Sequence, residues 1–192
     1  MNLRLLFLPS LLLGVLVACG GGATPEPTPT PAATRLVYTD PASGTYQVRQ
    51  NASLSTPTHL VLEVWGPATT SGCGATIAFS LSGTAATWSN VKTTDPAGTY
   101  VANGTAFDLG AGQAIVKAKV SGNTLVATVA EKGTASPKLL NKALLQVALD
   151  LKAGTPAGTA ITLTVDAPNC QVLLADGSLA PIPVTVSGVT AQ

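Results

Sequence analysis

Apolar and polar residues alternate with a period of two along much of this chain. In the segment Ile161–Asp166, isoleucine, leucine and valine fall on one face, whereas two threonines and an aspartate fall on the other. This is the period of a β-strand with one buried and one solvated face, and such strands belong to antiparallel sheets. The same alternation runs through residues 114–120, 125–129, 145–151 and 182–187.

The composition also favours strands over helices. Charged residues make up 10% of the chain, whereas a typical soluble domain has roughly 25%, and many β-branched residues favour strands. Further strands are expected at 36–39, 45–50, 60–65, 73–81 and 87–92, with a turn at Asp176-Gly177 and one helical turn at 137–142. About nine short strands predict an all-β fold, a single antiparallel β-sandwich of the jelly-roll kind.

The N-terminal segment has a different character from the rest of the chain. One positive charge in Met1–Arg4 precedes the apolar stretch Leu5–Val17, which is short for a transmembrane helix and fits the core of a secretory signal. The stretch ends in Leu16-Val17-Ala18-Cys19, which resembles a lipobox, the processing signal of bacterial lipoproteins. An ordinary secreted protein with a cysteine near its cleavage site is the alternative.

The lipobox resemblance implies a domain plan and a location. Residues 1–18 are then a cleaved signal peptide, and Cys19 carries diacylglycerol and an N-acyl chain such as palmitate. Residues 19–34, rich in glycine, proline and threonine, form an extended tether, with a proline-rich ligand as the alternative, and residues 35–192 form the β-domain. We expect a lipid-anchored envelope protein with an extracytoplasmic domain, on the outer membrane if the cell has one, because Gly20 rather than aspartate follows Cys19.

The C-terminal part of the domain resembles a known family. The segments that carry the resemblance are Leu144–Gly154, Pro156–Leu163, Leu173–Gly177 and Ile182–Gly188. They are similar to the last strands of cohesin domains, and the earlier strands match by pattern only. The resemblance implies the nine-stranded jelly roll that cohesins share with several carbohydrate-binding modules, and cohesins bind dockerins.

Two cysteines remain in the domain if Cys19 is lipidated. Cys73 and Cys170 both fall on apolar faces of their expected strands, and an exported protein with two remaining cysteines is expected to form a disulfide. Two buried thiols are the alternative. These cysteines and the lone His59 do not make a four-ligand metal site, so no metal is expected.

No catalytic constellation stands out in the sequence. His59 is the sole histidine of the chain, and we interpret it as a solvent-facing residue on a strand, because no motif supplies partners for a triad. Phosphate-binding and dinucleotide-binding motifs are also missing from the sequence. The sequence therefore predicts no enzyme and no cofactor, and a hydrolase with an unrecognised site is the remaining alternative.

Binding is the function class that remains. A carbohydrate site needs exposed aromatic faces, and the candidates are Trp65, which falls on the polar side of its strand, Trp88, whose side is undecided, and Tyr100. An envelope protein partner, or a structural lipoprotein with no small ligand, are the competing hypotheses. A net charge of +1 without a basic run argues against nucleic acid. A row of exposed aromatics would favour sugar, whereas an apolar patch or open edge strand would favour protein.

Overall fold

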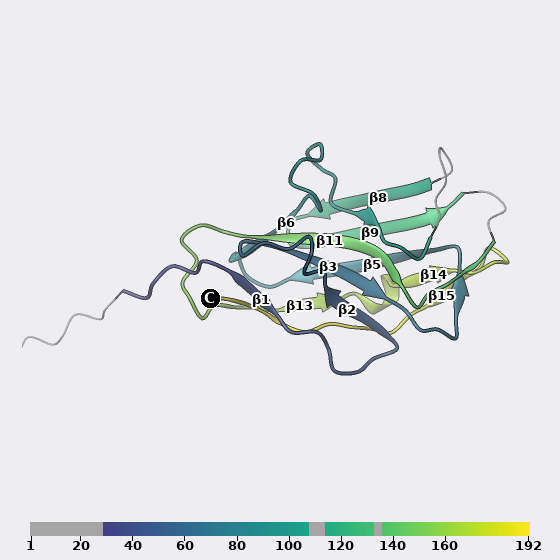
Figure 1. Cartoon of the computed structure of the whole chain (residues 1–192), viewed down its shortest axis with the longest axis horizontal. Coiled ribbons are helices and arrows are strands. Elements are labelled where there is room, and N and C mark those ends of the chain that lie inside the picture. The colour runs from purple at the N-terminus through teal and green to yellow at the C-terminus, as the bar shows by residue number, and fades with distance from the viewer. Residues whose placement is uncertain (1–28, 108–113, 133–135) are drawn as a thin grey trace, which may run out of the picture.

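Two β-sheets lie face to face in the computed structural model of the chain (Figure 1), which describes residues 29–107, 114–132 and 136–192. Residues 1–18 and Cys19 lie outside the described residues, as does most of the predicted tether. Within the described residues, no helix is long and apolar enough to cross a membrane.

The first sheet is built around one long strand, β11, and is called the β11 sheet below. Its strand order is β16-β2-β3-β11-β6, and β7 also pairs with β11. The pairs are antiparallel except for β16 with β2, which is parallel. The bounds are β2 Tyr46–Gln50, β3 His59–Trp65, β6 Ala86–Ser89, β7 Ala102–Asn103, β11 Ala143–Leu151 and β16 Val184–Thr185.

The second sheet faces the first and is called the β5 sheet below. Its order is β15-β14-β5-β9-β8, and β13 pairs with the remaining length of β5; all of these pairs are antiparallel. Gly122, with φ of 58°, allows the tight turn between β8 and β9, because glycine adopts positive φ without steric cost. The bounds are β5 Gly74–Leu81, β8 Ala114–Ser121, β9 Thr124–Glu131, β13 Leu163–Val165, β14 Gln171–Leu173 and β15 Leu179–Pro181.

Two small sheets close the ends of the sandwich. One has the order β1-β17-β12, formed by Leu36–Tyr38, Val189–Ala191 and Ala160–Ile161, and it brings the two ends of the domain together (Figure 1). The other pairs β4, Ser71–Gly72, with β10, Lys138–Leu139. Ahead of β1, Ala32 bridges to Pro156, so part of the segment predicted as tether contacts the domain. The strands and the contacts between them lie within residues 29–192.

The inward faces of the two sheets form one apolar core. Leu62 and Val64 of β3 face it beside Val147 and Leu145 of β11, and Phe79 of β5 faces it from the other sheet; all five are fully buried. The alternation seen in the sequence therefore has the expected cause, since the apolar member of each pair of residues points between the sheets.

The outer face of the β11 sheet is also covered over part of its length. Val61 of β3 and Ala148 of β11 point outward, yet both are fully buried with Val91 in a second small cluster. Leu54 and Ala102 pack against this cluster. The segments before β3 and after β6 thus fold over the sheet and remove one outer face from solvent.

The all-β sandwich predicted from the sequence is confirmed, with differences in detail. The short strands β4, β7, β10, β15 and β17 were not expected, whereas β14 is the strand expected beside Cys170. The helical turn predicted at 137–142 is wrong, because this segment instead contributes β10, which pairs with β4. A 3-10 turn lies at Ala167–Asn169, where Pro168 supplies a φ suited to the start of a helical turn.

A buried tyrosine connects both ends of the domain. The hydroxyl of Tyr38 donates a hydrogen bond to the carbonyl oxygen of Val48 (2.9 Å) and accepts one from the backbone N–H of Ser187 (3.1 Å). Burial raises the pKa of this phenol above its ordinary value, an effect that the Ser187 N–H partly offsets. The neutral phenol is therefore the form that the folded state favours.

We expect the folded state to lose stability above pH 10, where an exposed tyrosine ionises. Because the pKa of Tyr38 is higher in the folded state, its contribution is complete below that pH and is lost as the pH rises through the folded-state pKa. A Tyr38→Phe variant should be less stable by about 1 kcal/mol at pH 7 and should lose less stability between pH 10 and pH 12. Urea unfolding at both pH values measures this; identical alkaline losses in the two chains would contradict it.

Candidate binding surfaces

Glu63 is the centre of a polar network on the outer face of β2, β3 and β11. Its Oε1 accepts hydrogen bonds from Nδ2 of Asn51 (2.7 Å) and Nε2 of Gln146 (2.8 Å), and its Oε2 accepts one from the indole N–H of Trp65 (3.0 Å). The sequence correctly placed Trp65 on this polar side. The network holds the indole in one position at the end of β3.

The Trp65 ring carries a cation on one face. The guanidinium carbon of Arg49 lies 5.1 Å from the ring centroid, and Arg49 also donates two hydrogen bonds to Oε1 of Gln47 (2.7 and 3.1 Å). Such a contact contributes about 0.5–1 kcal/mol at an exposed site. Arg49 therefore competes with a sugar ring for that face of the indole, and carbohydrate binding by Trp65 stays a prediction.

Trp88 and Tyr100 lie together, away from Trp65. Trp88 is 7% exposed, its ring centroid lies 5.8 Å from that of Phe79 in the core, and its indole N–H donates to the carbonyl oxygen of Asn123 (2.8 Å). Tyr100 packs partly buried against the core and shares with Trp88 the lining of a hollow of about 360 Å³. The sequence left the side of Trp88 open, and the structure turns it inward, so most of its ring cannot stack on a ligand.

The interpretation of His59 as solvent-facing is wrong. The side chain is 7% exposed; its Nδ1 lies 2.6 Å from Oδ1 of Asp150, the residue opposite it on β11, and its Nε2 lies 3.2 Å from the carbonyl oxygen of Val91. The segment after β6 folds over this end of β3, which period-two alternation alone does not show. His59 fastens that segment to the sheet, and both of its ring nitrogens are engaged in doing so.

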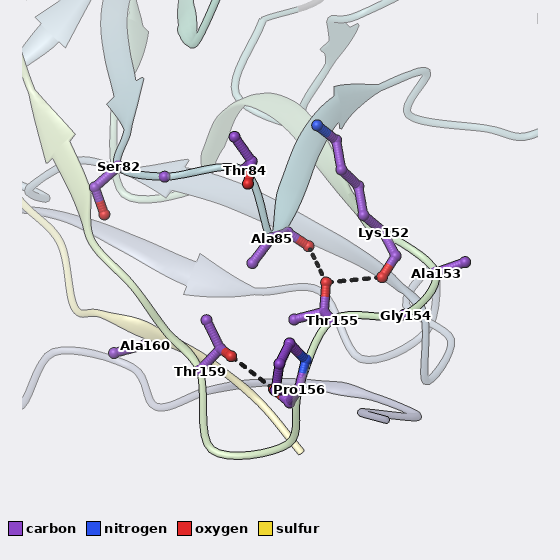
Figure 2. Close-up of a pocket in the computed structure, with 11 residues that line it drawn as sticks. Ser82, Thr84, Ala85, Lys152, Ala153, Gly154, Thr155, Pro156, Thr159 and Ala160 are labelled. Carbon is purple, nitrogen blue, oxygen red and sulfur yellow. Dashed lines mark hydrogen bonds between the residues drawn. The ribbon is translucent and has the colours of Figure 1, made fainter. Parts of the chain in front are cut away.

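A hollow of about 420 Å³ lies between the loop after β5 and the loop after β11 (Figure 2). Oγ1 of Thr155 lies 2.8 Å from the carbonyl oxygen of Lys152 and 3.3 Å from that of Ala85, and the hydroxyl of Thr159 donates to Pro156 (2.6 Å). The Lys152 side chain extends away from Thr155 (Figure 2) and carries the one charge among the described lining residues. The hydroxyls thus stabilise the loops themselves.

The same loop holds the start of the domain. The backbone N–H of Ala33 donates to the carbonyl oxygen of Thr155 (2.7 Å), and that of Ala157 donates to the carbonyl oxygen of Pro31 (2.8 Å). The hollow in Figure 2 is therefore next to the point where the chain enters the domain. The hydrogen bonds around it attach the entering segment to the loop that follows β11.

Cys73 and Cys170 do not form the predicted disulfide. Both are buried, as their apolar faces predicted, but Gly74 pairs with Leu173 and Thr76 pairs with Gln171. Continuing this register places Cys170 beside Ile77, four residues from Cys73 and thus about 13 Å along the strand. A disulfide needs Cα atoms within about 7 Å. The Cys170 thiol instead donates to the carbonyl oxygen of Asp166 (3.3 Å).

Cys73 and Cys170 should both react with an alkylating reagent once the chain is unfolded. A chain of residues 29–192, unfolded without reductant, should gain two carbamidomethyl groups from iodoacetamide, and a Cys170→Ser variant one, by intact mass. In the folded state at pH 8 labelling should be slower by at least about tenfold, because burial raises the pKa of both thiols and restricts access. A denatured chain that gains no carbamidomethyl group would instead indicate a disulfide between Cys73 and Cys170.

The outer face of the β5 sheet has a different character from that of the β11 sheet. Here small hydroxyl side chains pair across the strands: Oγ1 of Thr76 lies 2.9 Å from Oγ1 of Thr128, and Oγ of Ser80 lies 3.2 Å from Oγ1 of Thr124. Val126, between these pairs, is 37% exposed. This surface, called the open face below, consists of Thr76, Ser80, Thr124, Val126 and Thr128, with Lys117 and Lys119 of β8 beside them; Ala78, opposite Val126, is buried.

The β5 sheet also ends in a long edge strand. β8 pairs with β9 at all eight of its positions, and among the described residues no strand pairs with its other side. Figure 1 shows β8 at the rim of the molecule, beyond β9. An unpaired sheet edge and an outer face with an exposed valine at its centre are features that the sequence could not assign, because neither strand order nor loop coverage follows from periodicity.

The fold defined by this geometry is that of cohesin modules. A type II cohesin module from the scaffoldin ScaA of Acetivibrio cellulolyticus is 13% identical with a TM-score of 0.56, covering 78% of this chain and 96% of the module. A type II cohesin domain from the cellulosome of the same organism is 10% identical with a TM-score of 0.55, covering 77% and 95%. The sequence resemblance to cohesins is thus confirmed for the fold.

A third similar structure is a type II cohesin–X-dockerin complex, also from Acetivibrio cellulolyticus. The match is 14% identical with a TM-score of 0.52 and covers 73% of this chain and 92% of that one. No protein-family model matches the sequence, and no curated protein matches it. At these identities the comparisons establish the cohesin-like β-sandwich.

Proposed function

We propose that this chain is a non-catalytic protein-binding module and that the open face is its binding surface. The observation that carries this proposal is the difference between the two outer faces. Loops and the Glu63 network occupy the outer face of the β11 sheet, whereas the open face presents small hydroxyls around the exposed Val126. An apolar centre with a polar rim is the usual arrangement of a protein interface.

The similar structures support a protein partner. One of them is a cohesin in a complex with an X-dockerin, so the same sandwich holds another protein in that case. For this chain, the proposed partner is a protein, with no further identity. The engagement of His59 supports a non-catalytic role, because the sole histidine of the chain bonds with both ring nitrogens to Asp150 and Val91.

The module is displayed on the cell envelope by a lipid on Cys19. Four features of the sequence support this proposal: the charged start, the apolar stretch, the lipobox-like Leu16–Cys19 and the proline-rich segment after it. Two or more acyl chains anchor a protein stably, whereas a single chain gives only marginal binding. The entering chain meets the domain at the loop around Thr155, so the proposed tether joins the sandwich at that end.

A photo-crosslinking residue in place of Val126 should capture a protein in intact envelopes. The expected result is a discrete adduct of higher mass on a denaturing gel, identified by mass spectrometry, because Val126 lies at the centre of the open face. The matched control carries the same residue in place of Trp65 on the other sheet, where we expect no such adduct.

The pattern of adducts decides between the hypotheses. An adduct at Val126 and none at Trp65 supports the proposed surface. An adduct at Trp65 alone would indicate that the binding surface lies on the β11 sheet. Failure of both positions to capture a protein would contradict the proposal and favour a carbohydrate ligand or a structural lipoprotein.

Replacing Cys19 should abolish lipid labelling of the protein. The full chain expressed in bacteria should incorporate labelled palmitate and sediment with membranes, and the Cys19→Ser variant should lose the label and keep residues 1–18, because the lipobox-like signal for their removal is gone. Cys73→Ser is the control that keeps both properties, since Cys73 is buried within the sandwich. Palmitate incorporation by the Cys19→Ser chain would contradict the anchor.

A further inference from the structure

The edge strand β8 is long and regular. It spans Ala114–Ser121 and keeps one unbroken register with β9, from Ala114 opposite Glu131 to Ser121 opposite Thr124. In an antiparallel strand, alternate residues direct both their N–H and their C=O groups away from the paired neighbour. Along β8 these groups meet no strand of the described residues, so they form a ready template for another strand.

Among the described residues, the other edges of the two large sheets are shorter than β8. β15 at the opposite edge of the β5 sheet has three residues and ends in Pro181, which has no N–H to donate. At the edges of the β11 sheet, β16 has two residues and β6 has four. Short edges and proline are common protections against strand pairing, and β8 has neither.

The side chains of β8 define what kind of strand fits beside it. On the inner side, Val116 is 38% exposed at the rim of the core, and Ala118 and Val120 are partly buried against it. On the outer side, Lys117 and Lys119 are exposed, opposite Thr128 and Val126 of β9, which carry no charge. A neighbouring strand would extend the apolar row on one side and meet two positive charges on the other.

We propose that the protein partner adds an extended acidic segment to the free edge of β8. Its apolar side chains would cover Val116, and its carboxylates at alternate positions would lie beside Lys117 and Lys119, since cross-strand pairs of opposite charge stabilise a sheet. This inference rests on the proposed protein-binding role and adds the chemistry of the partner and its mode of binding.

A second copy of this chain is the wrong occupant for the edge. Antiparallel pairing of two β8 strands about Ala118 would place Lys117 of one copy opposite Lys119 of the other, on the same outer side. Like charges directly opposite each other destabilise a strand pair. Lysines on an edge strand hinder self-association and at the same time select an acidic partner over a neutral or basic one.

The test uses a chain of residues 29–192 and a synthetic peptide in which valine and glutamate alternate over seven positions, capped at both ends. Amide hydrogen exchange followed by NMR is the readout.

We expect every second amide of β8 to become protected by the peptide, while the amides already bonded to β9 change little. The matched peptide with lysine in place of glutamate should bind at least about tenfold more weakly, and the Lys117→Glu/Lys119→Glu chain should reverse this preference.

Each other outcome overturns the inference and leaves the proposed function to its own test. Absence of alternate protection along β8 with the acidic peptide would reject strand addition. Equal binding of the acidic and lysine peptides would reject the charge selection. Protection of these amides in the free chain, together with a dimer in sedimentation, would assign the edge to a second copy. A protein captured at Val126 alongside any of these results would retain the open face as a binding surface without strand addition.

Discussion

The pairing of β11 with β3 is the interaction on which the rest of this sandwich depends. The two strands share a register from Leu145 opposite Val64 to Asp150 opposite His59, and their inward side chains are fully buried against the β5 sheet. β6, β7 and β2 then attach to this pair on either side. A β-bulge interrupts the register at Leu144, whose buried side chain adds to the core. Because this central pair is buried on both faces over part of its length, it also holds the loops that cover its outer side.

That coverage is what makes the two outer faces unequal. Val91 and Leu54 lie over Val61 on the β11 sheet, and His59 fastens the covering segment through Val91. The β5 sheet carries hydroxyl pairs and Val126 on its outer face, with the free edge of β8 beside them. A sandwich needs only one buried face per sheet. The second outer face is therefore available for binding, and on this molecule its position is set by the path of two loops.

The sequence predicted the orientation of side chains better than their separation. Cys73 and Cys170 were both expected to point inward, and both are buried, but the register of β14 on β5 keeps them too far apart for a disulfide. Trp65 was expected on the polar side and lies there beside Glu63. His59 was expected to face solvent and is buried, because a segment more than thirty residues later in the chain folds over it. Orientation follows from local periodicity, whereas separation and cover depend on partners far away in sequence.

A resemblance of the last strands pointed to a sandwich of the cohesin kind. The sequence by itself determined that this chain forms strands and which residues of each strand face the core. These properties follow from the two-residue period of a β-strand and from the burial of apolar side chains, and both can be seen within a few residues. Only the tertiary structure decided the order of the strands, which makes β8 an edge strand. It also decided that loops cover the outer face of the β11 sheet, whereas the open face of the β5 sheet stays exposed to solvent. The physical reason is that strand order is set by pairings such as Val37 with Thr190 and Ala78 with Val126, whose members are brought together only when the whole core forms.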